Sequence, residues 1–318
     1  SDLDGAPELA RQGANANELI IPMLEMDGLA DYDRNGGYVD GDVTMKNHTV
    51  QCNFDRGRMF TVDTVDDAET AGLAFGRLAA EFIRTKVVPE LDAFRFACYA
   101  GKAGISSAEG TLSSGADVIA AISAAVTEMD ENEVPSDQRH LRITSTLLRA
   151  IKDMDSYKSR EVLESFASVK AVPQRRFYTA IEQLSGRDGE KAGGFQKYGK
   201  HYVKCAKDDT GALEVIADSG TVSGSQIKAA DVTPVADPAY TPTAGDYVKA
   251  VAGAEINFMI LHTPALIQFQ KHVAPKIISP EQNQHADAWK YGYRNVGIAD
   301  VYANKLSGVF CHHKAAGV

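Results

Sequence analysis

The sequence has no paired cysteines, no long apolar run and none of the short motifs that mark common catalytic sites. No apolar stretch approaches the roughly 20 residues that a membrane helix needs, so we expect no membrane partner. The Walker A, GxGxxG, GxSxG and HExxH patterns are all missing, which predicts a protein that is not an enzyme and binds no cofactor. The cysteines are scattered without a CxxC pair, which favours reduced thiols over a disulfide framework; they are Cys52, Cys98, Cys205 and Cys311.

The size and charge of the chain restrict its organisation and its partners. The chain has 318 residues, of which 44% are hydrophobic and 24% charged, and this length allows one large domain or two to three subdomains. Lys and Arg number 33 against 43 Asp and Glu, which gives a formal net charge of −10. Bulk electrostatics therefore oppose binding to nucleic acid, and any contact with DNA has to be local or weak.

The first 30 residues read as an extended arm. Small and polar residues dominate, and the single apolar patch is LIIPML at 19–24. Such a segment buries too little surface to fold alone, so we expect it to dock on a neighbouring element or subunit. It has no signal-peptide pattern, and it lacks an initiating Met; we expect that either the Met was removed, which the small Ser1 permits, or a longer precursor was cut.

Residues 31–66 are predicted to form a two-stranded β-ribbon. The turn-forming sequence DRNGG at 33–37 precedes apolar residues at 38–39 and 43–45, and Val50, Cys52 and Phe54 alternate on the return strand. A two-stranded ribbon is only marginally stable in water. We therefore expect this ribbon to lie on another surface, such as that of the next subunit.

A long helix is predicted after the ribbon. Asp66 and Glu69 form a capping-box pattern, and apolar residues at helical spacing continue to about Val88. Pro89 either kinks this helix or begins a second one that ends at Gly101.

The rest of the chain mixes helices with strands, which predicts an α+β fold. Ser114 and Asp117 cap a predicted helix that extends to Met129, and residues 186–246 read as an inserted loop-rich or β-rich segment. Further helices are expected at 146–153 and 264–271. Strands are predicted at 140–145, 169–172, 177–181, 198–205, 213–216, 256–262, 276–279, 287–301 and 308–312.

Three clusters of polar residues are candidate functional sites. His312 and His313 beside Cys311 could bind a metal, but consecutive residues of a strand point to opposite faces, so we predict no metal site. The acidic residues at 63–69 stand at a helix start, where capping explains them more simply than catalysis. Arg56 and Arg58 could contact phosphate, but on a ribbon salt bridges between subunits or to a helix end are the favoured interpretation.

A series of sequence blocks carries a resemblance to a known family. The blocks are FDRGRMFTVD at 54–63, DDAET at 66–70, LAFG at 73–76, FIRTKVVPELDAFRF at 82–96, VPQRRFYTA at 172–180, INFMILHTPA at 256–265, ISPEQNQHADAWK at 278–290 and VYANKLSGVF at 301–310. In this order they closely resemble the major capsid proteins of tailed bacteriophages, which share the HK97-type fold.

The resemblance implies names and roles for the predicted elements. Residues 1–30 would be the N-terminal arm, 31–66 the E-loop, and 67–113 the P-domain with its spine helix, joined by a long strand at 281–297. Residues 114–280 would form the A-domain, with 186–246 as a probable insertion, and 298–318 would add its last strands and tail. Contacts between subunits are expected from four side chains, which are Arg56, Arg58, Glu81 and Arg84.

The resemblance also implies partners and a location. The chain would assemble with itself into the hexamers and pentamers of a shell around double-stranded DNA, with weak non-specific DNA contact. Scaffold, portal and decoration proteins would be further partners. The shell would be assembled in the cytoplasm of a bacterial host and found as the virion capsid. Two alternatives stay open, namely an encapsulin-like protein compartment and an unrelated soluble enzyme whose site lies in the insertion.

Overall fold

The chain divides into two compact units that each combine segments far apart in the sequence. The computed structural model describes residues 3, 11–12, 18–32, 34, 36–38, 40–65, 73–154, 156–187, 190–199, 201–217, 220–232 and 241–315. The first unit joins Ser1–Ile83 to Thr263–Asn304, and the second joins Arg84–His262 to Lys305–Val318. The mixture of helices and largely antiparallel sheets is the α+β architecture that the sequence predicts.

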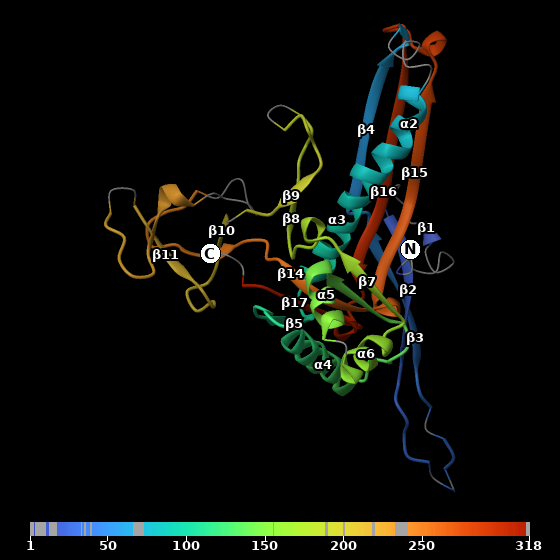
Figure 1. Ribbon diagram of the computed structural model, residues 1–318. Helices are drawn as coiled ribbons and strands as arrows, with labels where there is room; N and C mark the ends of the chain where they lie inside the picture. Colours follow the sequence, from blue (N-terminus) through green and yellow to red (C-terminus); the bar gives the residue numbers. More distant parts are fainter. Residues whose placement is uncertain are drawn as a thin grey trace. The chain divides into compact units, whose positions relative to one another are not determined.

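The first unit contains a long three-stranded antiparallel sheet (Figure 1). Its strand order is β15 (Leu266–Ile278), β16 (Ala288–Val301) and β4 (Phe54–Asp63). The strand predicted at 287–301 is confirmed as β16. A close approach explains one glycine, since a Cβ atom at Gly57 would lie 2.8 Å from the carbonyl oxygen of Tyr293.

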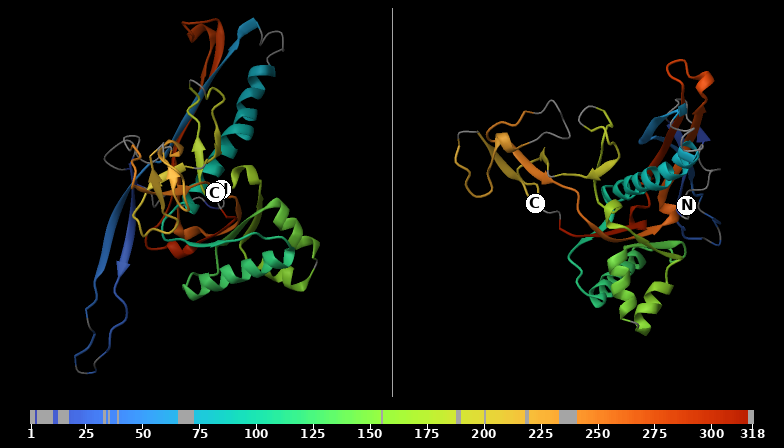
Figure 2. Two further views of the ribbon diagram at one scale, coloured as in Figure 1. Left: turned by 90° about the vertical axis from the view of Figure 1, so that its left-hand side faces the viewer. Right: turned by 45° about the horizontal axis from the view of Figure 1, so that its top comes forward.

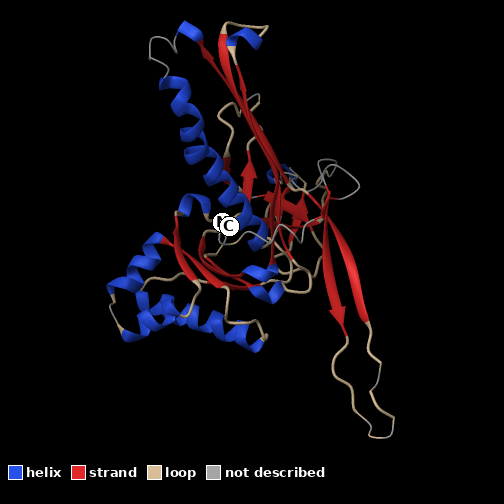
Figure 3. Ribbon diagram, turned by 90° about the vertical axis from the view of Figure 1, so that its right-hand side faces the viewer, coloured by secondary structure: helices blue, strands red, loops and turns tan. Residues whose placement is uncertain are grey.

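The first unit also contains a long hairpin, which we call the ribbon (Figure 3). It consists of β2 (Glu18–Met26) and β3 (Val43–Gln51), and the two-residue strand β1 (Arg11–Gln12) pairs with β2. The predicted pairing is wrong, because the apolar patch at 19–24 is itself a ribbon strand and residues 54–63 belong to the long sheet. The turn-forming residues are part of a longer connection, and such local chemistry does not choose the partner of a strand.

The predicted long helix is present from Leu73 onward. α2 (Leu73–Phe82) leads into a π-helical turn (Ile83–Val87) and then into α3 (Val88–Ala100). Pro89 stands in the first turn of α3 and Gly101 is its C-cap, so the proline begins a new helical segment. The predicted N-cap, Asp66, and its partner Glu69 lie outside the described residues.

The second unit contains a five-stranded sheet that helices cover on one side (Figure 1). Its strands, in order across the sheet, are β5 (Ser106–Glu109), β17 (Val309–His313), β14 (Ile256–His262), β6 (Arg139–Thr144) and β7 (Ser168–Val172). The helices are α4 (Gly115–Glu131), α5 (Ser145–Asp153) and α6 (Tyr157–Glu164). Apolar residues of the helices and of β6, β14 and β17 form one core, with Val118, Ile122, Met129, Leu141, Ile143, Ile151, Phe258, Ile260 and Phe310 among its members.

Between β7 and β14 lies a group of short strands that includes most of the predicted insertion (Figure 2, yellow to orange). β8 (Ile181–Gln183) and β9 (Phe195–Lys197) form a hairpin. A four-stranded sheet follows, in the order β10 (His201–Lys204), β13 (Tyr247–Val251), β11 (Leu213–Ile216) and β12 (Ile227–Lys228). Val215, Val232 and Val248 form its small core. Short 3₁₀ turns occur at Gln174–Arg176, Ala229–Asp231, Thr263–Ala265, Pro280–Gln282 and Leu306–Gly308.

Most local predictions are confirmed and two are wrong. The helices predicted at 114–129 and 146–153 and the strands predicted at 140–145, 169–172, 213–216, 256–262 and 308–312 are present, with bounds that differ by at most two residues. The helix predicted at 264–271 is wrong, because residues 264–265 belong to a 3₁₀ turn and residues 266–271 begin β15, which pairs with β16. The strand predicted at 177–181 is also wrong, because regular pairing starts only at Ile181.

Candidate assembly interface

The ribbon presents an exposed apolar face. Successive residues of a strand point to opposite faces, so Val43 and Met45 share one face of β3, and Met26 lies opposite Val43 on β2. The exposed fractions of Met26, Val43 and Met45 are 68%, 62% and 68%. Large apolar side chains that are exposed together mark a surface for interaction.

The segment that joins the two ribbon strands is acidic and aromatic. The backbone N–H of Asp42 donates to Oδ2 of Asp27 at 2.8 Å, which closes the base of the segment. The rings of Tyr32 and Tyr38 lie 4.9 Å apart, and both side chains are exposed. From Asp27 to Asp42 the sequence contains five aspartates and one arginine. A basic partner with some apolar surface would therefore complement this end of the ribbon.

The other end of the ribbon is anchored in the first unit. Leu19 is buried together with Ile267 of β15 and Ile298 of β16, and Val50 packs against this cluster. Nζ of Lys271 donates to the carbonyl oxygen of Glu18 at 3.1 Å. The ribbon thus has a fixed base and a free outer half.

The sequence predicts Arg56 and Arg58 on the ribbon, and this prediction is wrong. Both residues lie on β4 of the long sheet. They stand opposite Asn295 and Tyr293 of β16, and Arg58 is exposed while Arg56 is half-buried. The alternation of strand residues places both on the face that carries Phe60. α2 packs on this face, because the ring of Phe82 lies 4.7 Å from that of Phe60 and 6.1 Å from that of Tyr293.

Glu81 and Arg84 flank the boundary between the two units. Glu81 is in the last turn of α2, next to Phe82, and belongs to the first unit. Arg84 is in the π-helical turn and is the first residue of the second unit. Both side chains are exposed. The structure therefore brings Arg56 and Arg58 to one face of β4, with Glu81 beside the aromatic residue that packs there.

An ion pair between β4 and β16 was not anticipated from the sequence. The guanidinium of Arg294 donates to both carboxylate oxygens of Asp55, from Nε at 2.9 Å and from Nη2 at 2.5 Å. This hydrogen bonding lowers the pKa of Asp55 below its ordinary value and raises that of Arg294. The two residues are 239 positions apart, so no local signal could have paired them.

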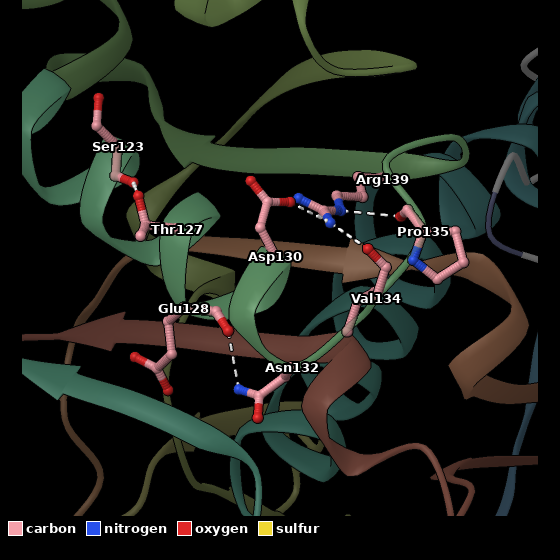
Figure 4. A network of polar contacts seen from close by, with 8 residues as sticks. All are labelled: Ser123, Thr127, Glu128, Asp130, Asn132, Val134, Pro135 and Arg139. Carbon is pink, nitrogen blue, oxygen red and sulfur yellow. Dashed lines mark hydrogen bonds and ion pairs between the residues drawn. The ribbon is translucent and has the colours of Figure 1, made fainter.

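The second unit has a buried arginine that fixes the turn after α4 (Figure 4). Arg139 is only 3% exposed, and it donates to Oδ1 of Asp130 at 2.7 Å and to the carbonyl oxygens of Val134 and Pro135. The turn contains Glu133 with a φ of 55°, a left-handed conformation that side chains rarely adopt. These bonds hold a turn that its own residues do not favour.

The two consecutive histidines of β17 differ in environment. His312 is buried, its ring stacks on Phe258 with centroids 5.1 Å apart, and its Nδ1 lies 3.0 Å from Nδ2 of Asn257. Burial lowers the pKa of His312, and nearby His313 acts in the same direction. Nδ1 of His313 instead lies 2.8 Å from the carbonyl oxygen of Lys314. Over the described residues, no three His, Cys, Asp or Glu side chains gather in a way that could hold a metal ion.

Several solved structures are similar to the chain at low sequence identity. No family model matches the chain, and no curated protein matches its sequence. It is similar to a structure of Mycobacterium phage Che8, with 13% identity, 94% of this chain and 85% of that chain covered, and a TM-score of 0.48. It is also similar to the mature capsid of bacteriophage PhiM1, with 11% identity, 94% of this chain and 82% of that chain covered, and a TM-score of 0.45. A virus-like particle from Pyrococcus furiosus matches with 7% identity, 93% of this chain and 86% of that chain covered, and a TM-score of 0.49.

At these identities and scores, the function has to be argued from the residues of the chain itself. In the described part of the chain, no helix combines the length and the apolar character that a bilayer crossing requires.

Proposed function

We propose that this chain is the structural subunit of an icosahedral shell that encloses the genome of a tailed bacteriophage, and that it works through its interfaces and not as an enzyme. Two independent lines support the proposal. The ordered sequence blocks resemble major capsid proteins, and the described residues form a long ribbon, a long helix and an extended sheet, which are elements that the resemblance implies.

The observation that carries the proposal is the ribbon. An isolated two-stranded ribbon is marginal in water, yet this one has nine residues in each strand, is anchored only at its base, and exposes Met26, Val43 and Met45 in its outer half. A second copy that covers this face would bury the apolar side chains that the ribbon leaves exposed. At about 25 cal/mol for each Å² of apolar surface covered, such a contact stabilises an assembly by several kcal/mol. Closed rotational symmetry would repeat the gain around each ring of subunits.

The proposed roles of the parts follow the resemblance, with the E-loop reassigned to the ribbon at 18–51. The division into arm, P-domain and A-domain stays a prediction, as does the role of 186–246 as an A-domain insertion. Hexamers and pentamers would build the shell, with scaffold, portal and decoration proteins as partners and the host cytoplasm as the place of assembly. A chain with a net charge of −10 would touch double-stranded DNA only weakly and without sequence preference.

Electron microscopy of the purified protein tests the proposal directly. Uniform icosahedral shells that contain DNA are expected. Shells that contain protein cargo would point to the compartment alternative. A subunit that never assembles, even with its scaffold supplied, would contradict the proposal and restore the enzyme alternative.

The four predicted contact residues give a second test. Arg56→Glu reverses a charge on the face of β4 that carries Phe60, so we expect a folded subunit that does not form shells. Lys158→Glu, an exposed reversal on α6, serves as the matched control and should assemble normally. Arg58, Glu81 and Arg84 can be reversed in the same way. Normal particles from the Arg56 variant would remove this residue from the interface.

A further inference from the structure

The exposed apolar face of the ribbon is built largely from methionine. The strand register places Met26 opposite Val43, and the alternation along β3 places Met45 on the same face. Met26 and Met45 are therefore diagonal neighbours across the two strands, close enough for their long side chains to form one continuous surface. Each is 68% exposed, and no other methionine among the described side chains is exposed to that extent. Both thioethers are thus open to small reagents in solution.

Methionine differs from valine, the other apolar residue of this face, in that a mild oxidant changes it into a polar group. Hydrogen peroxide converts methionine into methionine sulfoxide. A lone pair of Sδ forms the new S–O bond, the O–O bond breaks, and the displaced oxygen leaves as water. The sulfur is oxidised and the peroxide is reduced, so the reaction needs no cofactor.

The other methionines of the chain are less accessible. Met59 of β4 is 53% exposed and Met154, which follows α5, is 41% exposed, whereas Met129 and Met259 are fully buried. The sulfur of Met154 packs closely on Gly115, because a Cβ atom at that glycine would lie 2.6 Å from Sδ. Oxidation of the unassembled subunit should therefore reach the two ribbon methionines first.

The cysteines are poorer targets for peroxide than the exposed methionines. Burial raises the pKa of the thiols of Cys52, Cys205 and Cys311, and it brings that of Cys311 to about 12. Peroxide attacks the thiolate and not the thiol, so these three side chains react slowly at neutral pH. A thiol reductant also reverses disulfides and sulfenic acids but leaves methionine sulfoxide in place, so the two kinds of damage can be separated.

Oxidation of this face would affect association more than folding. In the unassembled subunit the face is open to water, so the added oxygen keeps its hydrogen bonds to solvent. In a contact between copies the same oxygen would be buried beside apolar groups, where a polar group without a partner is costly. Because Met26 and Met45 share one face, sulfoxides at the two positions would act on the same contact.

We propose that Met26 and Met45 form an oxidation site through which peroxide blocks assembly of the subunit, and that assembly in turn shields both thioethers. The inference rests on the proposed function, because it requires that the ribbon face is covered between copies. The modification is reversible, since methionine sulfoxide reductases return the sulfoxide to the thioether. Oxidised subunits are therefore withheld from the shell and not destroyed.

Modification interference tests the proposal in the unaltered chain. Unassembled subunits are oxidised with hydrogen peroxide to about one sulfoxide per chain, reduced with dithiothreitol and allowed to assemble. Mass spectrometry then compares the methionines of the shells with those of the subunits left unassembled. Sulfoxide at Met26 and Met45 should be at least about threefold rarer in the shells, whereas sulfoxide at Met154 should be equally frequent in both fractions.

A variant without the two sulfurs gives a second test. Met26→Leu with Met45→Leu nearly conserves side-chain volume, so the variant should form shells and keep its yield after peroxide treatment. The wild type should lose at least about tenfold in yield at the same dose and regain it after incubation with methionine sulfoxide reductases. Met59→Leu with Met154→Leu is the matched control and should stay as sensitive as the wild type. Circular dichroism of the oxidised subunit verifies folding.

The outcomes that overturn the inference differ from those that overturn the proposed function. Sulfoxide at Met26 and Met45 that is as frequent in shells as outside them would remove the site and leave the shell proposal intact. A double leucine variant that peroxide inhibits as strongly as the wild type would place the damage elsewhere. If that variant does not assemble even untreated, the interference experiment decides alone. An untreated wild type that never assembles would overturn the proposed function itself.

Discussion

The long sheet of the first unit and the five-stranded sheet of the second are built from similar strands but are covered very differently. Every residue of β6 and of β14 is buried, with helices on one side and a continuous apolar core beneath them. In β4 only Phe54 is buried, and β15 is largely exposed beyond Gln268. Within the described residues, the five-stranded sheet is covered by its own chain, whereas much of the long sheet and of the ribbon is exposed.

The largest effect is expected in the core of the five-stranded sheet. Phe258→Ala removes a fully buried ring that stacks on Phe310 and His312, so the free energy of unfolding should fall by about 3–5 kcal/mol. Urea denaturation of the unassembled subunit measures it. Val222→Ala, at a side chain that is 44% exposed, should change the free energy by less than about 0.5 kcal/mol. Similar losses from both variants would mean that Phe258 does not lie in a packed core.

A smaller loss is expected at the turn after α4. Arg139→Ala removes the ion pair with Asp130 and leaves the carbonyl groups of Val134 and Pro135 without their donor. The expected cost is about 1–3 kcal/mol in the same denaturation experiment. Arg149→Ala, the same change at an exposed position of α5, should be nearly neutral. Equal effects would show that the turn holds without Arg139.

Acid should lower the free energy of unfolding of the five-stranded sheet through its buried histidines, His262 and His312. The pKa values of His262 and His312 are lowered in the folded protein, chiefly by burial, so the unfolded chain binds protons more readily. Their contribution is complete above the unfolded value near 6.5 and is lost as the pH falls through the lowered values. Stability measured between pH 7 and pH 5 should therefore decline, and His312→Gln should make the decline shallower. An unchanged slope would assign the dependence elsewhere, first to His262 with Asp137, Arg139, His140 and Lys305 around it.

The smallest effect on the isolated subunit is expected on the ribbon. Met45→Ala alters a side chain that is 68% exposed, so the free energy of unfolding should change by less than about 0.5 kcal/mol. If the proposed function holds, the yield of shells should nevertheless fall, because the proposal assigns this surface to contacts between copies. Met154→Ala, at a side chain that is 41% exposed outside the ribbon, should leave both quantities unchanged. A loss of subunit stability with Met45→Ala would mean that the ribbon is covered within its own chain.

Local sequence signals predict most of the five-stranded sheet and of the helices that cover it. The capping box of Ser114 and Asp117 marks the start of α4, and the apolar run at 256–262 gives β14 with its observed bounds. α6 was not predicted, although Ser156 caps it through a hydrogen bond from the backbone N–H of Ser159. The signal was present there, but the short helix has few apolar residues.

Long-range pairing accounts for what the sequence did not reveal. Residues 264–271 have a spacing that suits a helix, but the pairing of β15 with β16 makes a strand from Leu266 onward. The predicted bounds of the ribbon are wrong for the same reason. Its first strand precedes the turn-forming residues in the structure, whereas the prediction places it after them. This error in the bounds placed Arg56 and Arg58 on the wrong element. The ion pair of Asp55 with Arg294 depends on the same distant pairing and had no local sign.

The pairing of β4 with β16 also sets a timetable for synthesis. Asp55 leaves the ribosome 239 residues before Arg294, which at about 5–20 residues per second is roughly 12 to 48 s. Throughout that interval β4 has no neighbouring strand, and Leu19 lacks the two isoleucines that bury it. Successive ribosomes on one messenger RNA would hold several nascent chains close together, each with an N-terminal segment whose partner strand is not yet made. Folding of this chain during synthesis therefore requires that β4 does not pair with the β4 strands of neighbouring nascent chains before β16 is made.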